Sequence, residues 1–337
     1  MSASEQQTID WRDESAFAAQ LERHRREVQV HCYRMLGSLE DSEDLVQETF
    51  LRAWRRRASF GADGRFSFRA WLYRIATNAC LDVLRGRPRR VLPSEVAPPG
   101  DPTAPPPPPA DLPWLEPYPN RLLEAIAPPE DEPGAAIVAR ETIELTFIAA
   151  IQHLPPRQRA VLILRGVLGW SATDAAALLE ASVAAVNSAL QRARATLRDH
   201  LGERTEWARS PASSVEEREL LRRYVGAHER ADGEALAALL REEARLTMPP
   251  HPTWYDGKAA IMIASEKGFD PDFGSLRSVV ACANLQPAVG HYLRPPGERE
   301  ARPLALDLLR VEDGLIVEIT SFVRPELFPA FGLPATA

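Results

Sequence analysis

The sequence predicts a multi-domain protein in which two all-α domains are joined by a proline-rich linker and followed by an α+β domain. Three observations support this fold class. Apolar residues recur at helical spacing over 14–87 and 136–201, 16 of the 30 prolines fall within 88–134, and alternating β-rich runs begin near residue 275. A length of 337 residues also favours two or three domains over one.

Charge is distributed in blocks of opposite sign, although the whole chain carries a net charge of −7. Between Arg52 and Arg90 there are 11 arginines and only two aspartates, whereas between Val91 and Gly134 there are eight acidic residues and one arginine. The net charge argues against a general nucleic-acid binder. The basic block is nevertheless typical of a surface that faces phosphates.

The first domain, 14–87, is predicted to be helical. The segment DSEDLVQETFLRAW at 41–54 begins with acidic residues, which suit a helix N-terminus, and continues with an apolar stripe. It is either a plain amphipathic helix, which periodicity alone favours, or a docking helix whose polar face meets a large partner. The segment WLYRIATNACLDVLRGRPRR at 71–90 has a second apolar stripe with arginines beside it.

Aromatic residues precede this second helix in SFGADGRFSFRAW, where Phe60, Phe66 and Phe68 stand among glycines and arginines. Arginines neutralise phosphates, and aromatic rings stack on unpaired bases. The mixture therefore predicts a platform for single-stranded nucleic acid. The alternative is a set of core aromatics beside a solvated arginine face.

The linker, 88–134, is predicted to be an extended tether with partial polyproline-II character, because it contains PPPPP at 105–109. One island within it, LPWLEPYPNRLLEAI, is aromatic and apolar. We expect this island to dock on a neighbouring surface, with a solvated linker as the alternative.

The second domain, 136–201, has the pattern of a helix-turn-helix. Ser171 is expected to cap a short helix that runs through Leu179, and a turn follows at Glu180 and Ala181. Ser182 then caps a longer helix with basic positions near its end. This order of elements is typical of DNA-binding domains.

The third domain, 214–337, is predicted to be α+β because helices come first and an antiparallel sheet follows. The expected helices cover 215–229, 233–241 and GKAAIMIASEKGF, and the expected strands cover EARLTMPP, 275–283, 285–293, 303–312 and 314–323. Asp313 and Gly314 are expected to form the turn of a hairpin.

Three long segments resemble the bacterial sigma-70 family and are most similar to its extracytoplasmic-function (ECF) group. They are HCYRMLGSLEDSEDLVQETFLRAWRRRASF, FRAWLYRIATNACLDVLRGRPRR and LPPRQRAVLILRGVLGWSATDAAALLEASVAAVNSALQRARATL. The resemblance covers about 14–201 in family order and spacing. The block after it resembles a SnoaL-like domain of the nuclear-transport-factor-2-like superfamily, through YDGKAAI and VEDGLIVEITSF.

The resemblance implies an RNA polymerase sigma factor that acts in the cytoplasm, is not an enzyme and needs no cofactor or metal. Residues 14–87 would be sigma region 2, 136–201 sigma region 4, and 214–337 a SnoaL-like domain that modulates activity in cis. The implied partners are promoter DNA and the β′ clamp and β flap of core RNA polymerase. The promoter, the inducing signal, any small ligand and any anti-sigma factor are not specified by these residues.

The resemblance also assigns roles residue by residue. Core polymerase would be bound by Asp41, Asp44, Leu45, Gln47, Glu48 and Phe50. The −10 element would be bound and melted by Phe60, Arg65, Phe68, Arg69, Trp71, Arg74 and Asn78. The −35 element would be read by Ser182, Ala184, Asn187, Ser188, Gln191, Arg192 and Arg194. Asn187 and Ala189 stand where many relatives have basic residues, which implies fewer phosphate contacts.

Two rival functions remain at this point. A one-component transcription factor would explain 136–337 but would leave 14–87 without a role. A SnoaL-type enzyme would require convergent titratable groups, and the candidates are His228, His251, Trp254, Asp256, His291, Tyr292 and Asp307. Asp307 either points into a pocket, where it could act as a base, or faces solvent. An enzyme would need Asp307 and a histidine within hydrogen-bond reach in a closed pocket.

The remaining sequence features concern membrane spans, secretion signals and cysteines. There is no run of about 18 apolar residues and no basic start followed by an apolar stretch, so we expect neither a membrane span nor a secretion signal. The three cysteines lie in apolar segments without metal-binding spacing, and we expect them to be buried free thiols.

Overall fold

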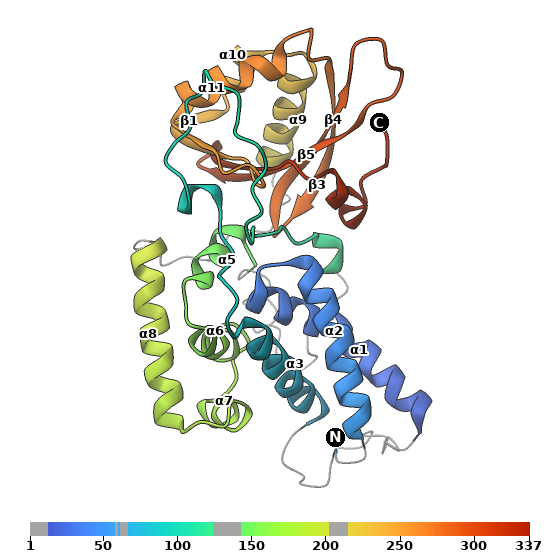
Figure 1. Cartoon of the computed structure of the whole chain (residues 1–337), viewed down its shortest axis with the longest axis vertical. Helices are drawn as coiled ribbons and strands as arrows, with labels where there is room; N and C mark the ends of the chain where they lie inside the picture. The colour runs from blue at the N-terminus through green and yellow to red at the C-terminus, as the bar shows by residue number, and fades with distance from the viewer. Residues whose placement is uncertain (1–12, 58–59, 61–66, 124–142, 202–214) are drawn as a thin grey trace. The chain divides into compact units, whose positions relative to one another are not determined.

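The computed structural model describes residues 13–57, 60, 67–123, 143–201 and 215–337. The chain separates into two compact units. The first contains Met1–Arg89 and Leu122–Thr205, and the second contains Arg90–Arg121 and Glu206–Ala337. The predicted fold class is confirmed, since helical domains come first and an α+β domain follows (Figure 1).

The described part of the first unit is helical. Its elements are α1 (Glu14–Leu36), α2 (Leu39–Arg56), α3 (Phe68–Leu84), α5 (Leu145–Gln152), α6 (Pro156–Leu162), the π-helical turn η4 (Ile163–Val167), α7 (Ala172–Leu178) and α8 (Val183–Leu201). In Figure 1, α1, α2 and α3 lie together as one group, and α5 to α8 form the other.

Serine side chains fix the start of several of these helices. Ser38 Oγ accepts a hydrogen bond from the Asp41 backbone at 3.1 Å and so caps α2. Ser171 caps α7 in the same way, and Ser182 Oγ accepts from the Ala185 backbone to cap α8. The helix-turn-helix predicted from these two serines is therefore present in the structure.

The core of α1, α2 and α3 is built from the apolar stripe predicted for α3. Leu72, Ile75, Ala76 and Ala79 are all buried, and α3 packs against both α1 and α2. A stripe of this width provides a helix with most of its stability, because it removes apolar surface from water. Arg85 and Arg87, which follow the stripe, are exposed.

The second unit contains one six-stranded sheet. Its strands are β1 (Leu240–Thr247), β2 (Trp254–Asp256), β3 (Ser275–Ala283), β4 (Gln286–Arg294), β5 (Arg302–Glu312) and β6 (Leu315–Phe322), in the spatial order β2-β1-β6-β5-β4-β3. The pair β1 and β6 is parallel, and all other neighbours are antiparallel. The turn between β5 and β6 is formed by Asp313 and Gly314, both with positive φ, as predicted for a two-residue hairpin.

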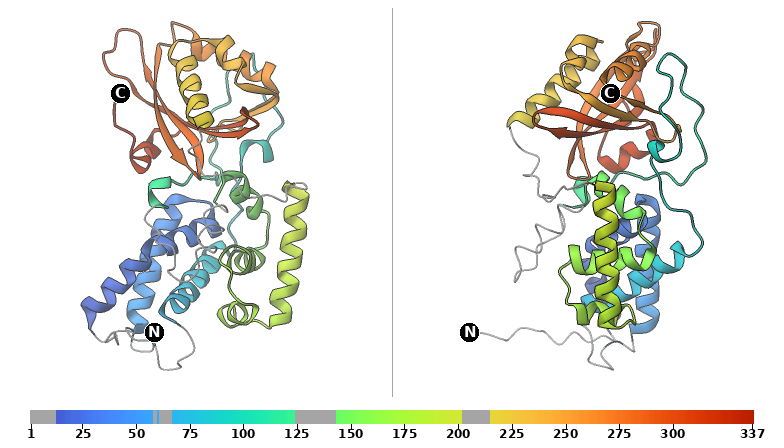
Figure 2. Two further views of the ribbon diagram at one scale, coloured as in Figure 1. Left: turned by 180° about the vertical axis from the view of Figure 1, so that it is seen from behind. Right: turned by 90° about the vertical axis from the view of Figure 1, so that its left-hand side faces the viewer.

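Helices α9 (Val215–Glu229), α10 (Gly233–Ala237) and α11 (Lys258–Glu266) pack on this sheet (Figure 2). Helix α9 contacts β3 and β4, and α11 contacts β1 and β2. Between them lies an apolar core that includes Tyr224, Val289 and Leu309. Short 3₁₀ turns complete the unit at η2 (Pro93–Glu95), η5 (Lys267–Phe269) and η6 (Pro325–Phe331), and η3 (Asn120–Leu122) lies where the two units join in sequence.

Two local predictions differ from the structure. The helix expected over 233–241 ends at Ala237, because Leu240 already pairs with Ile316 in the sheet. Cys32 and Cys80 are buried as expected, but Cys282 is exposed because β3 is an edge strand. No helix among the described residues is long and apolar enough to cross a membrane.

The segment Arg90–Arg121, called the strap below, belongs to the second unit, although helices α5 to α8 of the first unit follow it in sequence. The teal and green trace of Figure 1 shows it beside the strands of that unit. The last part of the strap is anchored to its own unit, as shown by the burial of Trp114, Leu115, Glu116 and Tyr118. The strap therefore differs from the free tether predicted from its prolines, whereas its aromatic island does dock.

Candidate functional site

The outer face of α2 carries part of the surface expected to bind core polymerase. Asp44 and Gln47 are exposed, and Glu48 beside them accepts a hydrogen bond from Arg52 Nε at 2.7 Å. Leu45 is only 7% exposed and packs in the helical core. Leu45 thus belongs to the stripe that buries the helix, and its part in binding core polymerase stays a prediction.

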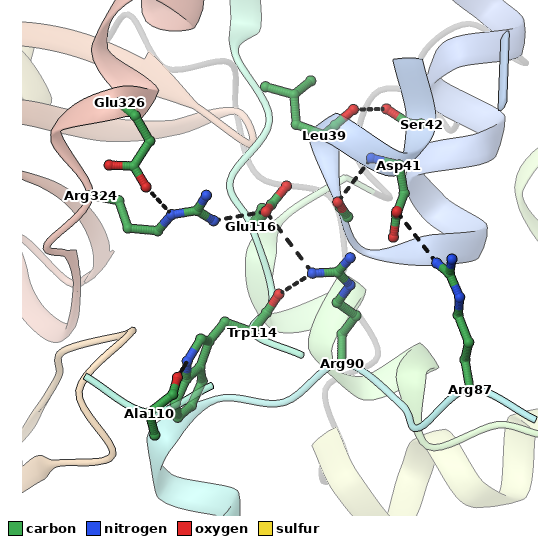
Figure 3. Close-up of polar contacts among 11 residues, drawn as sticks. Leu39, Asp41, Ser42, Arg87, Arg90, Ala110, Trp114, Glu116, Arg324 and Glu326 are labelled. Atoms are coloured by element: carbon green, nitrogen blue, oxygen red, sulfur yellow. Dashed lines mark hydrogen bonds and ion pairs between the residues drawn. The ribbon is translucent and has the colours of Figure 1, made fainter. Parts of the chain in front are cut away.

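Two further residues of this set have partners within the first unit. Asp41 accepts a hydrogen bond from Arg87 Nη1 at 3.4 Å (Figure 3). The guanidinium of Arg25 lies 4.8 Å from the ring centroid of Phe50, within the range of a cation–π contact. Both Asp41 and Phe50 are half-buried. The accessible polar face of α2 thus consists mainly of Asp44, Gln47 and Glu48.

The aromatic residues expected at the −10 element meet in one cluster. The ring centroids of Phe17 and Phe68 are 5.7 Å apart, and those of Phe60 and Trp71 are 5.0 Å apart. Phe68 is 7% exposed, so it belongs to the core and does not offer a ring face for stacking. Phe60 and Trp71 are half-buried and keep part of their surface accessible.

The polar residues of that set differ in how strongly they are held. Arg69 Nε donates to Glu27 Oε2 at 2.7 Å. Burial by itself would raise the pKa of Glu27, but His24 and Arg69 outweigh this effect and bring it below its usual value. Arg69 is thereby fixed by a charged partner, whereas Asn78 is exposed. Arg65 lies outside the described residues.

Every residue expected to read the −35 element is on an exposed face of α8 or at its cap. These residues are Ser182, Ala184, Asn187, Ser188, Gln191, Arg192 and Arg194. Ala189, in contrast, is buried on the opposite side of the helix with Val186 and Ala193. An alanine at 189 therefore cannot stand for a lost phosphate contact, and the departure from the family pattern rests on Asn187 alone.

The two helical groups of the first unit touch one another. Arg74 Nη2, on α3, donates to Glu180 Oε1, in the turn of the helix-turn-helix, at 2.5 Å. The ring centroids of Tyr73 and Trp170 are 5.5 Å apart. Arg159 is buried and donates to the Met35 carbonyl oxygen. The surfaces expected to bind the −10 and −35 elements are therefore held close together in this conformation.

A buried ion pair fixes the strap to the rest of the second unit. Arg324 Nη1 donates to Glu116 Oε1 at 2.8 Å, and Glu116 is only 4% exposed (Figure 3). Arg90 Nη1, at the start of the strap, lies 4.0 Å from the same carboxylate oxygen. Arg324 also donates to Glu326 at 2.7 Å. A buried carboxylate requires such partners, because an unpaired charge in the interior is strongly destabilising.

The strap also holds the turn between β3 and β4. The backbone N–H of Tyr118 donates to Asn284 Oδ1 at 2.7 Å, and the backbone N–H of Asn284 donates to the Tyr118 carbonyl oxygen at 2.8 Å. Asn284 and Leu285 both have positive φ, at 53° and 56°. Leucine is disfavoured there, so this turn depends on the contacts that the strap supplies.

Four polar or aromatic candidates of the third domain lie away from Asp307. Two of them contact the strap, and the other two contact residues of the domain itself. His251 Nδ1 lies 2.7 Å from the Pro107 carbonyl oxygen, and Trp254 Nε1 donates to the Ala97 carbonyl oxygen at 2.8 Å. Asp256 is exposed beside Arg245, and the Tyr292 hydroxyl donates to the Pro334 carbonyl oxygen at 2.8 Å. None of these four meets Asp307.

The other three candidates converge on a cavity of about 470 Å³ in the second unit. His291 Nε2 lies 3.1 Å from Asp307 Oδ2, and the Tyr224 hydroxyl donates to the same oxygen at 2.7 Å. The ring of His228 lies 4.6 Å from that of His291, measured between centroids. Asp307 therefore points into a cavity rather than to solvent, which settles the alternative left open by the sequence.

The charge state of this cluster follows from its burial. Burial would raise the pKa of Asp307, but His291 stabilises the carboxylate and the pKa is about 2. Burial lowers the pKa of His228 to about 4, and the nearby His291 adds to this effect. At neutral pH the cluster consequently contains an ionised Asp307 and a neutral His228. Burial also raises the pKa of Tyr224, which stays protonated.

Sequence reasoning did not identify Tyr224, Glu116 or Arg324. Tyr224 lies on the apolar stripe of α9, where its hydroxyl gives no local signal. Glu116 and Arg324 are 208 residues apart in sequence, so no local pattern relates them. Their pairing depends on how the strap crosses the folded domain.

Comparison with known proteins gives the following likenesses. The family model for sigma-70 region 2 matches residues 21–90, and that for sigma-70 region 4 matches residues 145–197. The chain is 41% identical over 322 residues to the ECF RNA polymerase sigma factor SigG of Mycobacterium tuberculosis, covering 94% of this chain and 84% of SigG. It is 32% identical to SigW of Bacillus subtilis, over 56% of this chain and 90% of SigW.

A likeness of fold extends over nearly the whole chain. The crystal structure of the Mycobacterium tuberculosis extracytoplasmic function sigma factor SigJ matches with a TM-score of 0.58 and 20% identity, covering 95% of this chain and 100% of that one. This chain therefore shares its fold with a solved structure, including the order of two helical regions and a C-terminal α+β domain.

Proposed function

This chain belongs to the ECF RNA polymerase sigma factors, and from that premise we propose that it binds core polymerase, recognises −10 and −35 promoter elements and starts transcription of a particular gene subset. The observation that carries the proposal is the exposed reading face of α8, because seven residues expected to meet the −35 element are all accessible together. A sigma factor acts where bacterial RNA polymerase transcribes, so we place its activity in the cytoplasm.

We assign the contact with the β′ clamp to the polar face formed by Asp44, Gln47 and Glu48, and the contact with the β flap to the helix-turn-helix domain. At the −10 element we assign Asn78, Arg74 and the accessible parts of Phe60 and Trp71. Phe68 and Arg69 support this surface from beneath, since one is buried and the other is bound to Glu27.

We further propose that the third domain modulates the sigma regions in cis through the strap. The strap lies between regions 2 and 4 in sequence and yet is bound to the third domain. Any change in how tightly that domain holds the strap alters the length of chain available between the two promoter-reading regions. Such a coupling needs no separate regulatory protein.

An enzymatic role is the second candidate, because Asp307 and His291 lie within hydrogen-bond reach at a cavity. The physical chemistry of the pair disfavours it. A general base works best when its pKa lies near the operating pH, whereas the pKa of Asp307 is about 2. Tyr224 weakens this carboxylate further as a base by donating a hydrogen bond to it. We therefore propose a binding role for the cavity rather than a catalytic one.

The proposed function is tested by run-off transcription with purified core polymerase on genomic promoter fragments. Initiation is expected only when the chain and core are both present. Arg192→Ala should weaken promoter binding and lower the slope of log K against log salt by about one unit, as for a lost phosphate contact. Arg222→Ala, an exposed arginine on α9, is the matched control and should leave the slope unchanged. Absence of polymerase-dependent initiation on every fragment would refute the proposal.

A further inference from the structure

The cavity of the second unit has a mainly apolar wall and a polar end. Its wall includes Leu236, Met248, Ile261, Phe269 and Leu276, and its polar end is formed by the cluster around Asp307. A volume of about 470 Å³ lies within the range of small-molecule sites. Protein interiors are normally close-packed by side chains. A cavity of this size with apolar walls and convergent polar atoms therefore points to a small-molecule ligand.

The hydrogen bonds of the two histidines determine what the polar end offers. His228 Nδ1 lies 2.9 Å from the Tyr224 carbonyl oxygen, which can only accept, so Nδ1 carries the proton. In the neutral ring, Nε2 of His228 is then an acceptor. His291 Nε2 faces the Asp307 carboxylate, which also only accepts, and its Nδ1 lies 2.9 Å from Ser278 Oγ. His291 therefore uses its Nε2 proton within the cluster.

Asp307 supplies the second acceptor. Its Oδ2 receives Tyr224 and His291. Its Oδ1 is buried and has no hydrogen bond of normal geometry among the described residues, although the nearby Ser321 hydroxyl helps to lower the pKa of the carboxyl group. A buried carboxylate oxygen without a donor is unfavourable until a donor reaches it. The polar end thus combines two acceptors, Asp307 Oδ1 and His228 Nε2, and the Tyr224 hydroxyl is already committed.

This pattern selects among ligand classes. A carboxylate or phosphate would meet the ionised Asp307 at the polar end, where the two negative charges repel. An ammonium group would share the cavity with the side chain of Lys267, which also lines it. A metal ion is the remaining alternative, because one ligand atom from each of His228, His291 and Asp307 lies within 4.8 Å of the others. Coordination by His291 Nε2, however, would require it to give up the proton that it shares with Asp307.

One part of the cavity wall comes from the strap. Pro102, Ala104 and Pro106 line the cavity, and the neighbouring Thr103 carbonyl oxygen accepts from Lys267 Nζ at 2.9 Å. On either side the strap is bound through its backbone. Gly100 N–H donates to the Trp254 carbonyl oxygen at 2.8 Å, and Ala110 N–H donates to the Pro250 carbonyl oxygen at 2.9 Å. A molecule in the cavity would therefore contact the strap and the domain together.

We propose that this cavity binds an uncharged, largely apolar small molecule whose hydroxyl group donates a hydrogen bond to Asp307 Oδ1, and that its binding holds the strap on the domain. The hydroxyl satisfies a buried acceptor, and the apolar body fills the space against the strap. Ligand occupancy then favours the docked strap over the released one by mass action. The binding step does not depend on polymerase, so it is testable independently of the sigma activity.

The binding test uses the full chain and matched probes. Phenol, 4-phenylphenol and 4-cyclohexylphenol are compared with their methyl ethers and with biphenyl-4-carboxylate by calorimetry and thermal melting. The largest fitting phenol is expected to bind at least tenfold more tightly than its ether and than the carboxylate. Equal or tighter binding of the ether or the carboxylate, or no binding of any phenol up to about 1 mM, overturns the proposal. Tight binding of Zn²⁺ that displaces the phenol also overturns it, in favour of a metal site.

Variants locate the site. Asp307→Asn replaces the acceptor pair with a mixed amide and should reduce the preference for phenol over ether to less than threefold, whereas the exposed Asp256→Asn is the matched control. Ala264→Trp fills the cavity and should abolish binding of all probes. Ile263→Trp, on the exposed side of the same helix, should not. If Asp307→Asn fails to fold, the pair on α11 still decides whether the probes occupy this cavity.

The effect on the strap is measured by hydrogen exchange with and without bound 4-phenylphenol. Exchange of the Gly100 and Ala110 amides should slow by at least tenfold when the probe is bound, while amides of α8 in the first unit should not change. Unchanged exchange at both strap amides, with binding confirmed, overturns the proposed link between ligand and strap. Normal transcription in the absence of any binding would refute this inference and leave the proposed sigma function intact.

Discussion

His31 shows how a single buried side chain connects the helical core to pH. It is fully buried in α1, and one ring nitrogen lies 2.9 Å from Thr77 Oγ1 while Nδ1 has no hydrogen-bond partner among the described residues. Burial lowers its pKa to about 3, and the nearby Arg34 adds to this effect. Folding therefore requires a neutral imidazole at this position.

Stability of the first unit is accordingly expected to fall on acidification. Between about pH 6.5 and 3 the unfolded state binds the proton that folded His31 excludes, so the free energy of unfolding decreases as pH falls, by up to about 1.4 kcal/mol per unit. Urea denaturation at pH 7, 6 and 5 measures this slope. The double variant His31→Leu with Thr77→Val should flatten it. The exposed His200→Gln serves as control, and an equally steep slope in the double variant would contradict the assignment.

At the scale of elements, the contact between α3 and the helix-turn-helix is at odds with simultaneous promoter reading. Elements centred near −10 and −35 are about 25 base pairs apart, or roughly 85 Å along the duplex. Arg74 and Glu180 are joined by a hydrogen bond of 2.5 Å. If the two modules bind both elements as proposed, they must therefore separate first, and the ion pair between Arg74 and Glu180 opposes that step.

Glu180→Gln is expected to favour the separated state while leaving the proposed −10 surface intact. The pair is solvent-exposed on the Glu180 side, so its loss is worth about 0.2–1 kcal/mol, or an increase of about 1.4- to 5-fold in the rate of open-complex formation. The measurement is a kinetic assay with saturating core and a promoter fragment at low salt. Glu216→Gln, on α9, is a control with the same chemistry. A slower rate for Glu180→Gln would show that the contact assists promoter binding instead.

Elements were predictable from sequence where the determining signals were local. Ser171 and Ser182 predicted the helix-turn-helix, and Asp313 with Gly314 predicted the last hairpin, because caps and tight turns depend on a few adjacent residues. The burial of Leu45 and Phe68 was not predictable in this way, since a stripe residue and a contact residue look alike until the neighbouring helices are placed. Strand β2 (Trp254–Asp256) was missed because three residues give too short a pattern.

The cavity cluster illustrates the same limit at the candidate site. Asp307 and two histidines were recognisable as candidates by residue type. Their convergence depends on the register of β4 against β5, which places His291 opposite Ala305 and Val289 opposite Asp307. Tyr224 joins them from α9. Register and helix packing are set by the whole core, and no local pattern in the sequence contains that information.

At the scale of the whole molecule, we expect the strap to set how far apart the two regions proposed to read the promoter can lie. Its 32 residues from Arg90 to Arg121 could span about 105 Å if they were released and fully extended. Docked, they follow the surface of the second unit and are held by Glu116, Tyr118 and several backbone hydrogen bonds. Under the proposed function, we expect the docked and released states to differ in the spacing between −10 and −35 elements that the protein tolerates.

Glu116→Ala is expected to release the strap. It removes the ion pair between the strap and Arg324, which keeps Glu326 as a charged partner, so the expected loss is about 1–3 kcal/mol from strap docking. Transcription is then measured on promoters that differ only in spacer length. The wild type should prefer a narrow range, and the variant should use a broader one. Glu298→Ala is the exposed control, and identical spacer profiles for all three proteins would rule out this role of the strap.

The strap also fixes an order of events during synthesis. Glu116 leaves the ribosome 208 residues before Arg324, its partner. At about 5–20 residues per second, that interval is roughly 10–40 s. The helices of α1, α2 and α3 need only neighbours that are already made, whereas the strap must wait for almost the entire third domain. Each new molecule thus passes through a period of tens of seconds in which region 2 has formed and the strap is still unbound. During that period the proline-rich strap of a nascent chain is open to binding by other proteins and to cleavage by proteases. In the mature chain the docked strap is protected from both.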